Sequence, residues 1–589
     1  MKNFFGRVLS TIIGNLATFS IFAIIIVALV FLSTLDSDKP SIKDTSVLEI
    51  TFNDTLLESD MDNEVSIFSI SEVENIYLID ILESIKKAKE DDNIKGISLK
   101  IESFQGGLAQ AEEIRNALKD FKKSGKFIYA YSNNASQTSY YLSSVADKIY
   151  QNPLGGVLLQ GMSSEVMFFK NAGDKYGIDF QIIRYGDYKS AVEPFFRTDL
   201  SDANKLQLNV LLQDIWGNIS KEISTERKLA IQDFNTVVDS LYAYIPEIGQ
   251  KNKIYDQIIH EAEYEDILFK KLGLKSSDKK TNFEILEKHT ININDYFESF
   301  SSDEKNDKVA ILYASGEITE GDGFDGIQSK TYVKAIREIE KNKKVKALVI
   351  RVNSPGGSAN ASEEILFELS RLKTKMPIVV SFGDVAASGG YYIAQNSDKI
   401  FAQNNTITGS IGVFGMIPNA QKLANNIGIT TDGVKTNANS DQLKSIFKPI
   451  STDTEKLMTK SVAMIYQKFV NHVARNRKMN FDQVDKLGGG RVWSGIAAKQ
   501  NNLVDEIGGL NDAINYAAKL AKLDSYSPIA YPKRKDSFEE LIDNLQSNSI
   551  KNNIKKEIGT ETYDIVNKIK TLNNQKGAQV RLPFDLKIQ

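Results

Sequence analysis

The feature that most constrains this chain is a long internal repeat. The first copy contains KGISLKIESFQGG, which begins at Lys95, and then YLSSVADKIYQNP; the second copy contains KALVIRVNSPGG and YIAQNSDKIFAQN in the same order. Aligning the two DKI triplets places Gln137 opposite Ser388 and Ser440 opposite Lys189. A repeat of this length indicates two related structural units. Because each copy lacks a reactive side chain that the other has, we expect one site assembled between two duplicated domains.

Each copy alternates short apolar runs with amphipathic stretches, which is the pattern of βαβ units. For the second copy this pattern predicts, in order, a strand, a tight turn, a helix and a strand at 347–352, 353–360, 361–373 and 377–381. For the first copy it predicts a strand, a helix and a strand at 96–101, 109–122 and 126–131. The sequence therefore predicts an α/β protein with two tandem domains of the same topology.

Length and charge limit the number of domains and the kind of partner. A chain of 589 residues is too long for one core, and the polar segment 275–308 is the predicted boundary. We expect a first domain at 41–300, a second at 301–525 and a peripheral extension at 526–589. The 72 basic and 76 acidic residues form no basic stripe, so nucleic acid is not an expected partner.

Cysteine and histidine usage excludes several kinds of chemistry. The chain has no cysteine, which rules out disulfides, thiolate metal sites and a cysteine nucleophile. Its three histidines, His260, His289 and His472, do not neighbour one another or a glycine-rich turn, so a zinc site is not expected. We predict no metal and no cofactor.

The N-terminus predicts a membrane anchor. No charged residue occurs between Val8 and Leu35, and a helix of the 21 residues from Ile12 to Leu32 would be roughly 30 Å long, the thickness of a bilayer core. Basic residues precede this run and acidic residues follow it, which predicts that 1–40 comprise a short cytoplasmic N-terminus and the transmembrane anchor, and that the remainder is external. A cleaved signal peptide is the alternative, but the run is longer than usual and lacks an Ala-x-Ala-like cleavage site.

The first candidate reactive residue is Ser388, in the segment GDVAASGGYYIA. The small neighbours leave room around its hydroxyl, and Gly389 lets a backbone N–H approach a bound carbonyl closely. A serine at a helix N-terminus also lies where backbone donors favour an oxyanion. The alternative reading is an ordinary N-cap serine after a strand.

A second glycine turn, NSPGGS, follows the preceding strand and strengthens the first reading. Gly356 or Gly357 can turn a backbone N–H toward a ligand, although Ser-Pro-Gly-Gly is also an ordinary turn. Together the two turns could supply both donors of an oxyanion hole. Since neither region contains histidine, a nucleophilic serine here needs another base, and lysine is the known alternative.

The candidate base is Lys189, in the segment RYGDYKSAVEPF of the first copy. To accept a proton near neutral pH, its amine must lose about 3 units from a reference pKa of about 10.4, which corresponds to roughly 4 kcal/mol. Burial in an apolar pocket can provide this, and the walls expected from neighbouring residues include Val192, Phe195 and Phe196. The alternative is a solvated surface lysine.

These motifs, together with the anchor and the repeat, resemble signal peptide peptidase A of the long, duplicated type (protease IV). This family comprises membrane-anchored Ser-Lys peptidases of the crotonase/Clp protease superfamily, and the resemblance runs from the anchor to about Leu523. It implies two tandem crotonase/Clp-like domains. It also implies that Ser388 is the nucleophile, that Lys189 is the general base, that Ser410 in TITGSIGVFG orients the lysine, and that Gly357 and Gly389 form the oxyanion hole.

The resemblance further implies a biological setting. We expect an endopeptidase that degrades remnant signal peptides and other short apolar peptides through an acyl-enzyme. The expected form is a homotetramer, anchored by a single pass in the bacterial inner membrane with its bulk on the periplasmic side. Two alternatives remain open: a catalytically inactive membrane scaffold and a crotonase-type acyl-CoA enzyme. Enzymes of the second kind use acidic residues with their oxyanion turns, and no acidic residue adjoins either glycine turn here.

Overall fold

The computed structural model describes residues 14, 18, 21, 42–52, 55–59, 76–301, 305–533 and 579–581. The predicted membrane anchor therefore falls almost wholly outside the described residues. Within the described ranges, no helix combines the length and the apolar character needed to span a bilayer.

The first copy is built on a parallel sheet whose strand order is β8-β6-β5-β4-β1-β9. Its strands are β1 (Ser46–Thr51), β4 (Ile94–Lys100), β5 (Phe127–Ser132), β6 (Lys148–Gln151), β8 (Gln257–Ile258) and β9 (Thr290–Asn292), and a short pair, β2 (Leu56–Leu57) and β3 (Ile76–Tyr77), lies apart. Its helices are α2 (Leu78–Glu90), α3 (Leu108–Lys122), α4 (Gln137–Ser143), α5 (Lys170–Tyr176), α6 (Glu193–Phe196), α7 (Asp202–Arg227), α8 (Ile231–Asp239), α9 (Pro246–Lys251), α10 (Glu261–Lys271), α11 (Asn282–Glu287) and α12 (Ile293–Phe300).

The second copy repeats this sheet strand for strand, in the parallel order β20-β16-β15-β13-β10-β21. Its strands are β10 (Lys308–Ser315), β13 (Val345–Ser354), β15 (Ile378–Ala387), β16 (Lys399–Ala402), β20 (Glu506–Ile507) and β21 (Ser527–Tyr531), with β17 (Ile407–Gly409) and β19 (Val492–Ser494) added at the end of β15. Its helices are α13 (Ser329–Lys341), α14 (Ala359–Lys373), α15 (Gly389–Ala394), α16 (Gln421–Asn426), α17 (Thr452–Asn476), α18 (Phe481–Leu487), α19 (Gly495–Gln500) and α20 (Leu510–Leu520).

The duplication extends to local hydrogen bonds. The Asp147 carboxylate accepts the Ile128 N–H at 2.9 Å, and the Asp398 carboxylate accepts the Ile378 N–H at 2.8 Å in the second copy. The long helices α7 and α17 also begin alike, since each follows a serine whose hydroxyl caps the first turn. The prediction of an α/β chain with a duplicated fold is confirmed.

Some predicted boundaries differ from the structure. The expected turn at 353–360 contains a short strand, β14 (Gly356–Ser358), because this turn joins a further sheet. The polar segment 275–308, where the boundary is predicted, holds α11, β9 and α12, and β9 pairs with β1 of the first copy. The expected peripheral extension from 526 begins with β21, which pairs with β10 in the second sheet.

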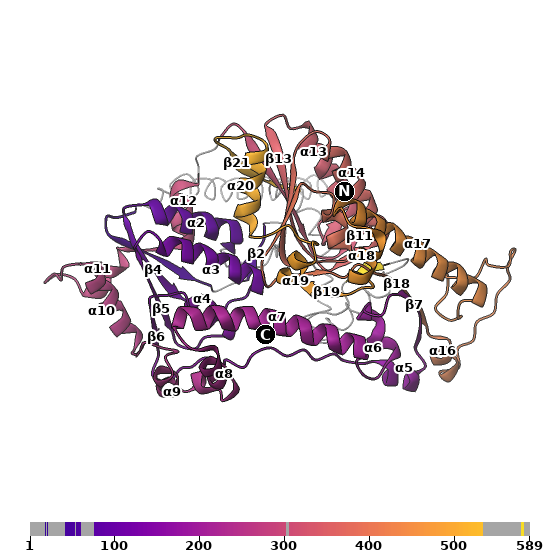
Figure 1. Ribbon diagram of the computed structural model, residues 1–589, viewed down its shortest axis with the longest axis horizontal. Coiled ribbons are helices and arrows are strands. Elements are labelled where there is room, and N and C mark those ends of the chain that lie inside the picture. The colour runs from indigo at the N-terminus through magenta and orange to yellow at the C-terminus, as the bar shows by residue number, and fades with distance from the viewer. Residues whose placement is uncertain are drawn as a thin grey trace, which may run out of the picture.

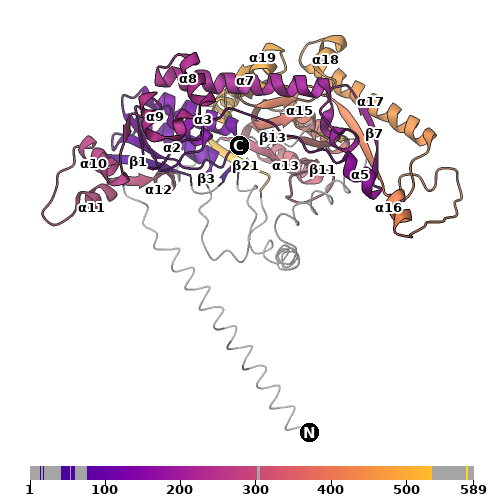
Figure 2. The same cartoon turned by 90° about the horizontal axis from the view of Figure 1, so that it is seen from below.

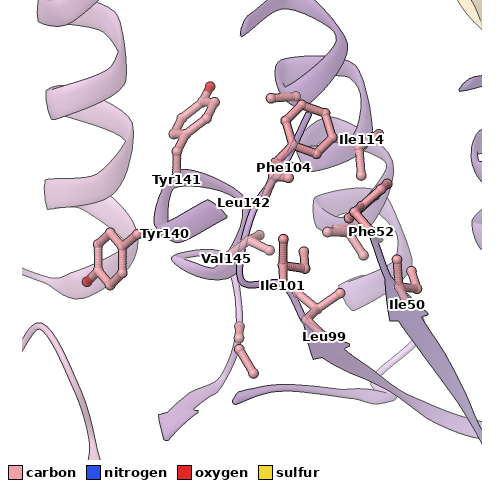
Figure 3. Packing of buried hydrophobic residues seen from close by; sticks show 14 of the residues in the cluster. Ile50, Phe52, Leu99, Ile101, Phe104, Ile114, Tyr140, Tyr141, Leu142 and Val145 are labelled. Carbon is pink, nitrogen blue, oxygen red and sulfur yellow. The ribbon is translucent and has the colours of Figure 1, made fainter. Parts of the chain in front are cut away.

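The hydrophobic core of the first copy continues into the second. Parallel strands buried on both faces read as continuous apolar runs, and β1 and β4 supply such residues to the cluster in Figure 3. There Phe52 meets Phe104 edge to face, with ring centroids 5.0 Å apart. The same cluster includes Ala387, Ile407 and Val492 of the second copy, so the two domains share packed apolar surface.

A third sheet joins the copies beside the core. Its order is β12-β11-β14-β22-β18-β7, where β7 (Asp179–Tyr185) belongs to the first copy and the others follow residue 300. The remaining strands are β11 (Ile318–Thr319), β12 (Ile327–Gln328), β18 (Val413–Asn419) and β22 (Gln579–Arg581). The β7 and β18 strands pair antiparallel over their whole length. Helix α7 also runs alongside both copies (Figures 1 and 2), and its Asp214 accepts the Ser494 hydroxyl at 2.8 Å.

Candidate active site

Lys189 belongs to the first copy but follows β7, the strand that pairs with β18 of the second copy. After β7 the chain turns, and Lys189 precedes a 3₁₀ helix at Ser190–Val192. The amide of Gln207 on α7 donates to the Tyr188 carbonyl at 3.2 Å and to the Ser190 hydroxyl at 2.9 Å. Helix α7 thereby holds the residues on both sides of the lysine.

The Lys189 amine meets two serines of the second copy. Its Nζ lies 2.8 Å from Ser388 Oγ, 3.0 Å from Ser410 Oγ and 3.3 Å from the Ser410 carbonyl oxygen. All three residues are fully buried. The structure thus brings together the predicted base, the predicted nucleophile and the predicted orienting serine.

Burial lowers the pKa of Lys189 well below its usual value. A neutral amine has two N–H donors and one lone pair. The Ser410 carbonyl oxygen can only accept, so it takes one N–H, and the Ser410 hydroxyl can take the other. The lone pair is then left for the Ser388 hydroxyl, which is the arrangement a general base requires.

The pocket walls come mainly from the second copy. A Cβ on Gly412 would lie 3.1 Å from Lys189 Cδ, and one on Gly490 would lie 2.6 Å from Lys189 Cα. The Phe414 ring centroid is 6.0 Å from the amine. The expected wall residue Phe195 packs instead against Phe169 and Phe180.

Ser388 lies in the sharp turn between β15 and α15. Its φ is +56° and its ψ is −111°, a sparsely populated conformation that costs about 1–3 kcal/mol. Its N–H donates to the Gly409 carbonyl at 2.8 Å. The hydroxyl makes no capping hydrogen bond to α15 and faces Lys189 instead, so the ordinary N-cap reading does not describe this serine.

Ser410 lies in the loop between β17 and β18. Its φ is +49°, and its N–H donates to the Arg491 carbonyl at 2.7 Å. The Arg491 segment follows the glycines at 488–490, whose Gly489 carbonyl accepts the Tyr188 N–H at 3.0 Å. This triple-glycine loop touches the lysine segment closely, and sequence reasoning missed it although three consecutive glycines were a visible signal.

The two glycine turns lie close together beside Ser388, because a Cβ at Gly390 would lie 2.8 Å from the Ser354 carbonyl oxygen. Gly389 is the first residue of α15, and the first N–H groups of a helix have no partner within it. In the other turn, the Gly356 N–H donates to Ser354 Oγ at 3.2 Å, which favours Gly357 over Gly356 as the second donor. A Cβ at Gly357 would lie 2.0 Å from the Ile318 carbonyl oxygen, so only glycine fits there.

The positions that match Ser388 and Lys189 in the opposite copies, Gln137 and Ser440, bond to backbone groups nearby in the chain. The Gln137 amide donates to the Gly161 carbonyl at 3.0 Å and accepts the Gly161 N–H at 3.0 Å. Ser440, opposite Lys189 in the repeat, hydrogen-bonds within its own exposed loop, where its Oγ accepts the Asn437 N–H at 3.1 Å. The described part of the chain therefore shows one Ser-Lys pair.

Among the described residues, the acidic side chain nearest Ser388 in the sequence is bonded elsewhere. Asp384, four residues before Ser388, accepts the Ala109 N–H at 2.7 Å from the start of α3. Across the described ranges, no group of His, Cys, Asp and Glu residues could hold a metal ion. The arrangement is suited to nucleophilic chemistry by an alcohol with an amine base.

Comparisons with known proteins identify the family. Residues 120–275 and 370–524 each match "Peptidase family S49", once in each copy. "Protease 4" of Salmonella typhi is 35% identical over 478 residues, which cover 80% of this chain and 76% of that protein. "Protease 4" of Haemophilus influenzae is 35% identical over 458 residues, covering 76% and 73%.

Among solved structures, a mutant of ClpP1 from Listeria monocytogenes covers 35% of this chain and 94% of its own at 16% identity. Its TM-score is 0.25, too low to bear on the fold. The family match and the two bacterial relatives suffice: the chain belongs to peptidase family S49 and is a serine peptidase.

Proposed function

We propose that this peptidase works through a Ser-Lys dyad in which Ser388 of the second copy is the nucleophile and Lys189 of the first copy is the general base. The observation that carries the proposal is the 2.8 Å contact between Ser388 Oγ and the buried amine of Lys189. A charged lysine is costly to bury without a counterion, and burial lowers its pKa. The amine is therefore able to take the serine proton.

Acylation follows from this geometry. The Ser388 oxygen attacks the scissile carbonyl while its proton passes to Lys189. The backbone N–H groups of Gly357 and Gly389 stabilise the developing oxyanion, and loss of one such donor costs about 3–4 kcal/mol of barrier. As the intermediate collapses, the C–N bond breaks and the Lys189 ammonium protonates the leaving amine.

Deacylation reverses the proton path. With the amine product gone, neutral Lys189 accepts a proton from water as the water oxygen attacks the acyl-enzyme. Collapse of this second intermediate breaks the ester bond, and the proton returns to Ser388. Ser410 stays hydrogen-bonded to the Lys189 amine in both steps, which keeps the lone pair of the amine directed at the reacting hydroxyl.

The substrates proposed are remnant signal peptides and other short apolar peptides. The support is the resemblance to signal peptide peptidase A and a relative named "Putative signal peptide peptidase SppA" from Enterococcus faecium, 36% identical over 250 residues. A single-pass anchor in the bacterial inner membrane, with the bulk of the chain on the periplasmic side, is supported by the uncharged run from Val8 to Leu35. Crotonase/Clp-like domains and a homotetramer remain proposals on the same resemblance.

The test is cleavage of an apolar fluorogenic peptide by matched variants. Ser388→Ala and Lys189→Ala should each abolish cleavage. Lys399→Ala is the control, because Lys399 pairs with Glu506 at the surface, away from the dyad, and should cleave normally. Near-normal cleavage by Lys189→Ala would refute the dyad, and a wild-type protein that folds but cleaves no peptide would favour the inactive-scaffold alternative.

A further inference from the structure

A buried carboxylate, Glu193, lies close to Lys189 in the chain. Glu193 is the first residue of α6 and is fully buried. It accepts the Ser201 hydroxyl at 2.6 Å and the Ser201 N–H at 3.2 Å, and the Arg184 guanidinium of β7 lies 3.5 Å away. The side-chain amide of Asn204 on α7 donates to the same carboxylate at 3.1 Å. A buried charge needs such partners, and neither step of the proposed mechanism uses this one.

The carboxylate fixes the direction of a chain of amides. An ionised carboxylate only accepts hydrogen bonds, so Asn204 turns its NH₂ group to Glu193 and its carbonyl oxygen to Gln207. The Gln207 Nε2 donates to that oxygen at 2.9 Å. The carbonyl oxygen of Gln207 then faces the second copy, where it accepts the Val492 N–H at 3.4 Å. Asn204 is 2% exposed and Gln207 is 1% exposed, so both amides need protein partners.

The Gln207 amide also holds the backbone on both sides of the proposed base. Its Nε2 donates to the Tyr188 carbonyl at 3.2 Å and to the Ser190 hydroxyl at 2.9 Å. Together with the Asn204 oxygen, these acceptors share its two N–H groups. Because the Lys189 backbone lies between Tyr188 and Ser190, a shift of this amide moves the lysine.

The contact with Val492 ties the same amide to the serines of the second copy. Val492 lies on β19, which pairs antiparallel with β17 and places Val492 opposite Gly409. The Gly409 carbonyl accepts the Ser388 N–H at 2.8 Å, and Ser410 follows Gly409 directly in the chain. Gln207 therefore connects the segment that contains the base to the strand that adjoins both serines.

We propose that Gln207 is a positioning residue of the dyad, which sets the distance between the Lys189 amine and the two serines. The Glu193 carboxylate orients the Gln207 amide through Asn204. The inference rests on the proposed function, because Gln207 acts through Lys189 and not on the substrate. A displacement of about 1 Å at a reacting centre can lower a rate about a hundredfold. A base that comes from one copy and serves the other therefore needs a fixed connection between them.

The kinetic test changes the amide and the carboxylate that orients it. Gln207→Leu removes every hydrogen bond of the amide, and kcat for an apolar fluorogenic peptide should fall about tenfold to a hundredfold at unchanged KM. Glu193→Gln keeps the shape but lets the chain of amides reverse, so kcat should fall about twofold to tenfold, the effect of one hydrogen bond. Unchanged kcat in both variants would overturn the inference.

Gln151→Leu is the matched control. Gln151 is a fully buried glutamine of the first copy whose amide donates to the Asn133 carbonyl at 2.8 Å. The control should lose stability in denaturant titrations, as Gln207→Leu should, but keep both kinetic constants. An equal loss of kcat in the control would mean that any buried glutamine has this effect, which would contradict a positioning role.

A double-mutant cycle shows whether Gln207 acts through the lysine. The rate at which a fluorophosphonate labels Ser388 is measured in the wild type, Gln207→Leu, Lys189→Ala and the double variant. Gln207→Leu should slow labelling about tenfold to a hundredfold in the wild type and hardly at all in Lys189→Ala, because residues that act as a unit are not additive. If Gln207→Leu does not fold, Glu193→Gln replaces it in the cycle, with about twofold to tenfold expected.

The cycle also separates this inference from the proposed function. Equal slowing in both backgrounds, or no slowing in either, would overturn the positioning role. Labelling of Lys189→Ala at the wild-type rate would refute the proposed function itself. Slow labelling of Lys189→Ala together with wild-type labelling of Gln207→Leu would leave the dyad intact and overturn the inference alone.

Discussion

Replacing Ser410 by alanine tests how the lysine is aimed. The change removes the hydroxyl that lies 3.0 Å from Lys189 Nζ but keeps the Ser410 carbonyl oxygen at 3.3 Å. A neutral hydrogen bond of this kind contributes about 0.5–1.5 kcal/mol. Since about 1.4 kcal/mol corresponds to a tenfold change in rate, kcat should fall roughly twofold to twelvefold. KM should stay unchanged, because the hydroxyl contacts the proposed base and not a bound peptide.

The assay is steady-state cleavage of an apolar fluorogenic peptide, with Ser98→Ala as the matched control. Ser98 is a fully buried serine of the first copy whose hydroxyl bonds Tyr264 at 2.8 Å rather than a residue of the dyad. The control should lose stability but little kcat. Two results would refute the reasoning: an unchanged kcat in Ser410→Ala, or a loss as complete as that of Lys189→Ala.

Three further predictions concern pH and packing. Because burial lowers the Lys189 pKa and only the neutral amine is a base, kcat/KM should rise with pH through a midpoint well below the ordinary lysine value of 10.5; a midpoint at that value in a rate profile would contradict this. Gly357→Ala should lower kcat about a hundredfold, because its Cβ would displace the oxyanion turn; unchanged kinetics would count against Gly357 as a donor. Burial, with the charge of Glu58, raises the Asp384 pKa from 3.8 to about 6. The folded value exceeds the unfolded one, so unfolding free energy should fall by at most ~3 kcal/mol as pH rises through this window. Denaturant titrations of Asp384→Asn at several pH values should show no such fall in unfolding free energy. An equal fall in the variant would mean that another group causes it.

Local patterns predicted much of each domain. The strands around β4 and β13 and the helices α3 and α14 follow from apolar runs and amphipathic spacing, which are properties of adjacent residues. Ser388 and Lys189 emerged because the repeat showed which position each copy had lost. Local spacing and the comparison of the two copies can both be found from the sequence alone.

Contacts between the copies could not be predicted in this way. The pairing of β7 with β18, the hydrogen bonds from Gln207 and the close approach of Gly490 to Lys189 join segments far apart in the chain. No periodicity marks such partners. The strand β22 is harder still, because three residues in a polar tail carry almost no pattern and their structure depends on the edges that they fill.

The central claim is that one catalytic site is formed by residues from both copies. Covalent labelling with a fluorophosphonate, mapped by mass spectrometry and followed over time, tests it most directly. The label should attach to Ser388 in the wild-type protein, at a rate that rises as Lys189 loses its proton, and Lys189→Ala should label far more slowly although its fold is intact. Labelling of another residue, or equal rates in the wild type and Lys189→Ala, would contradict the claim.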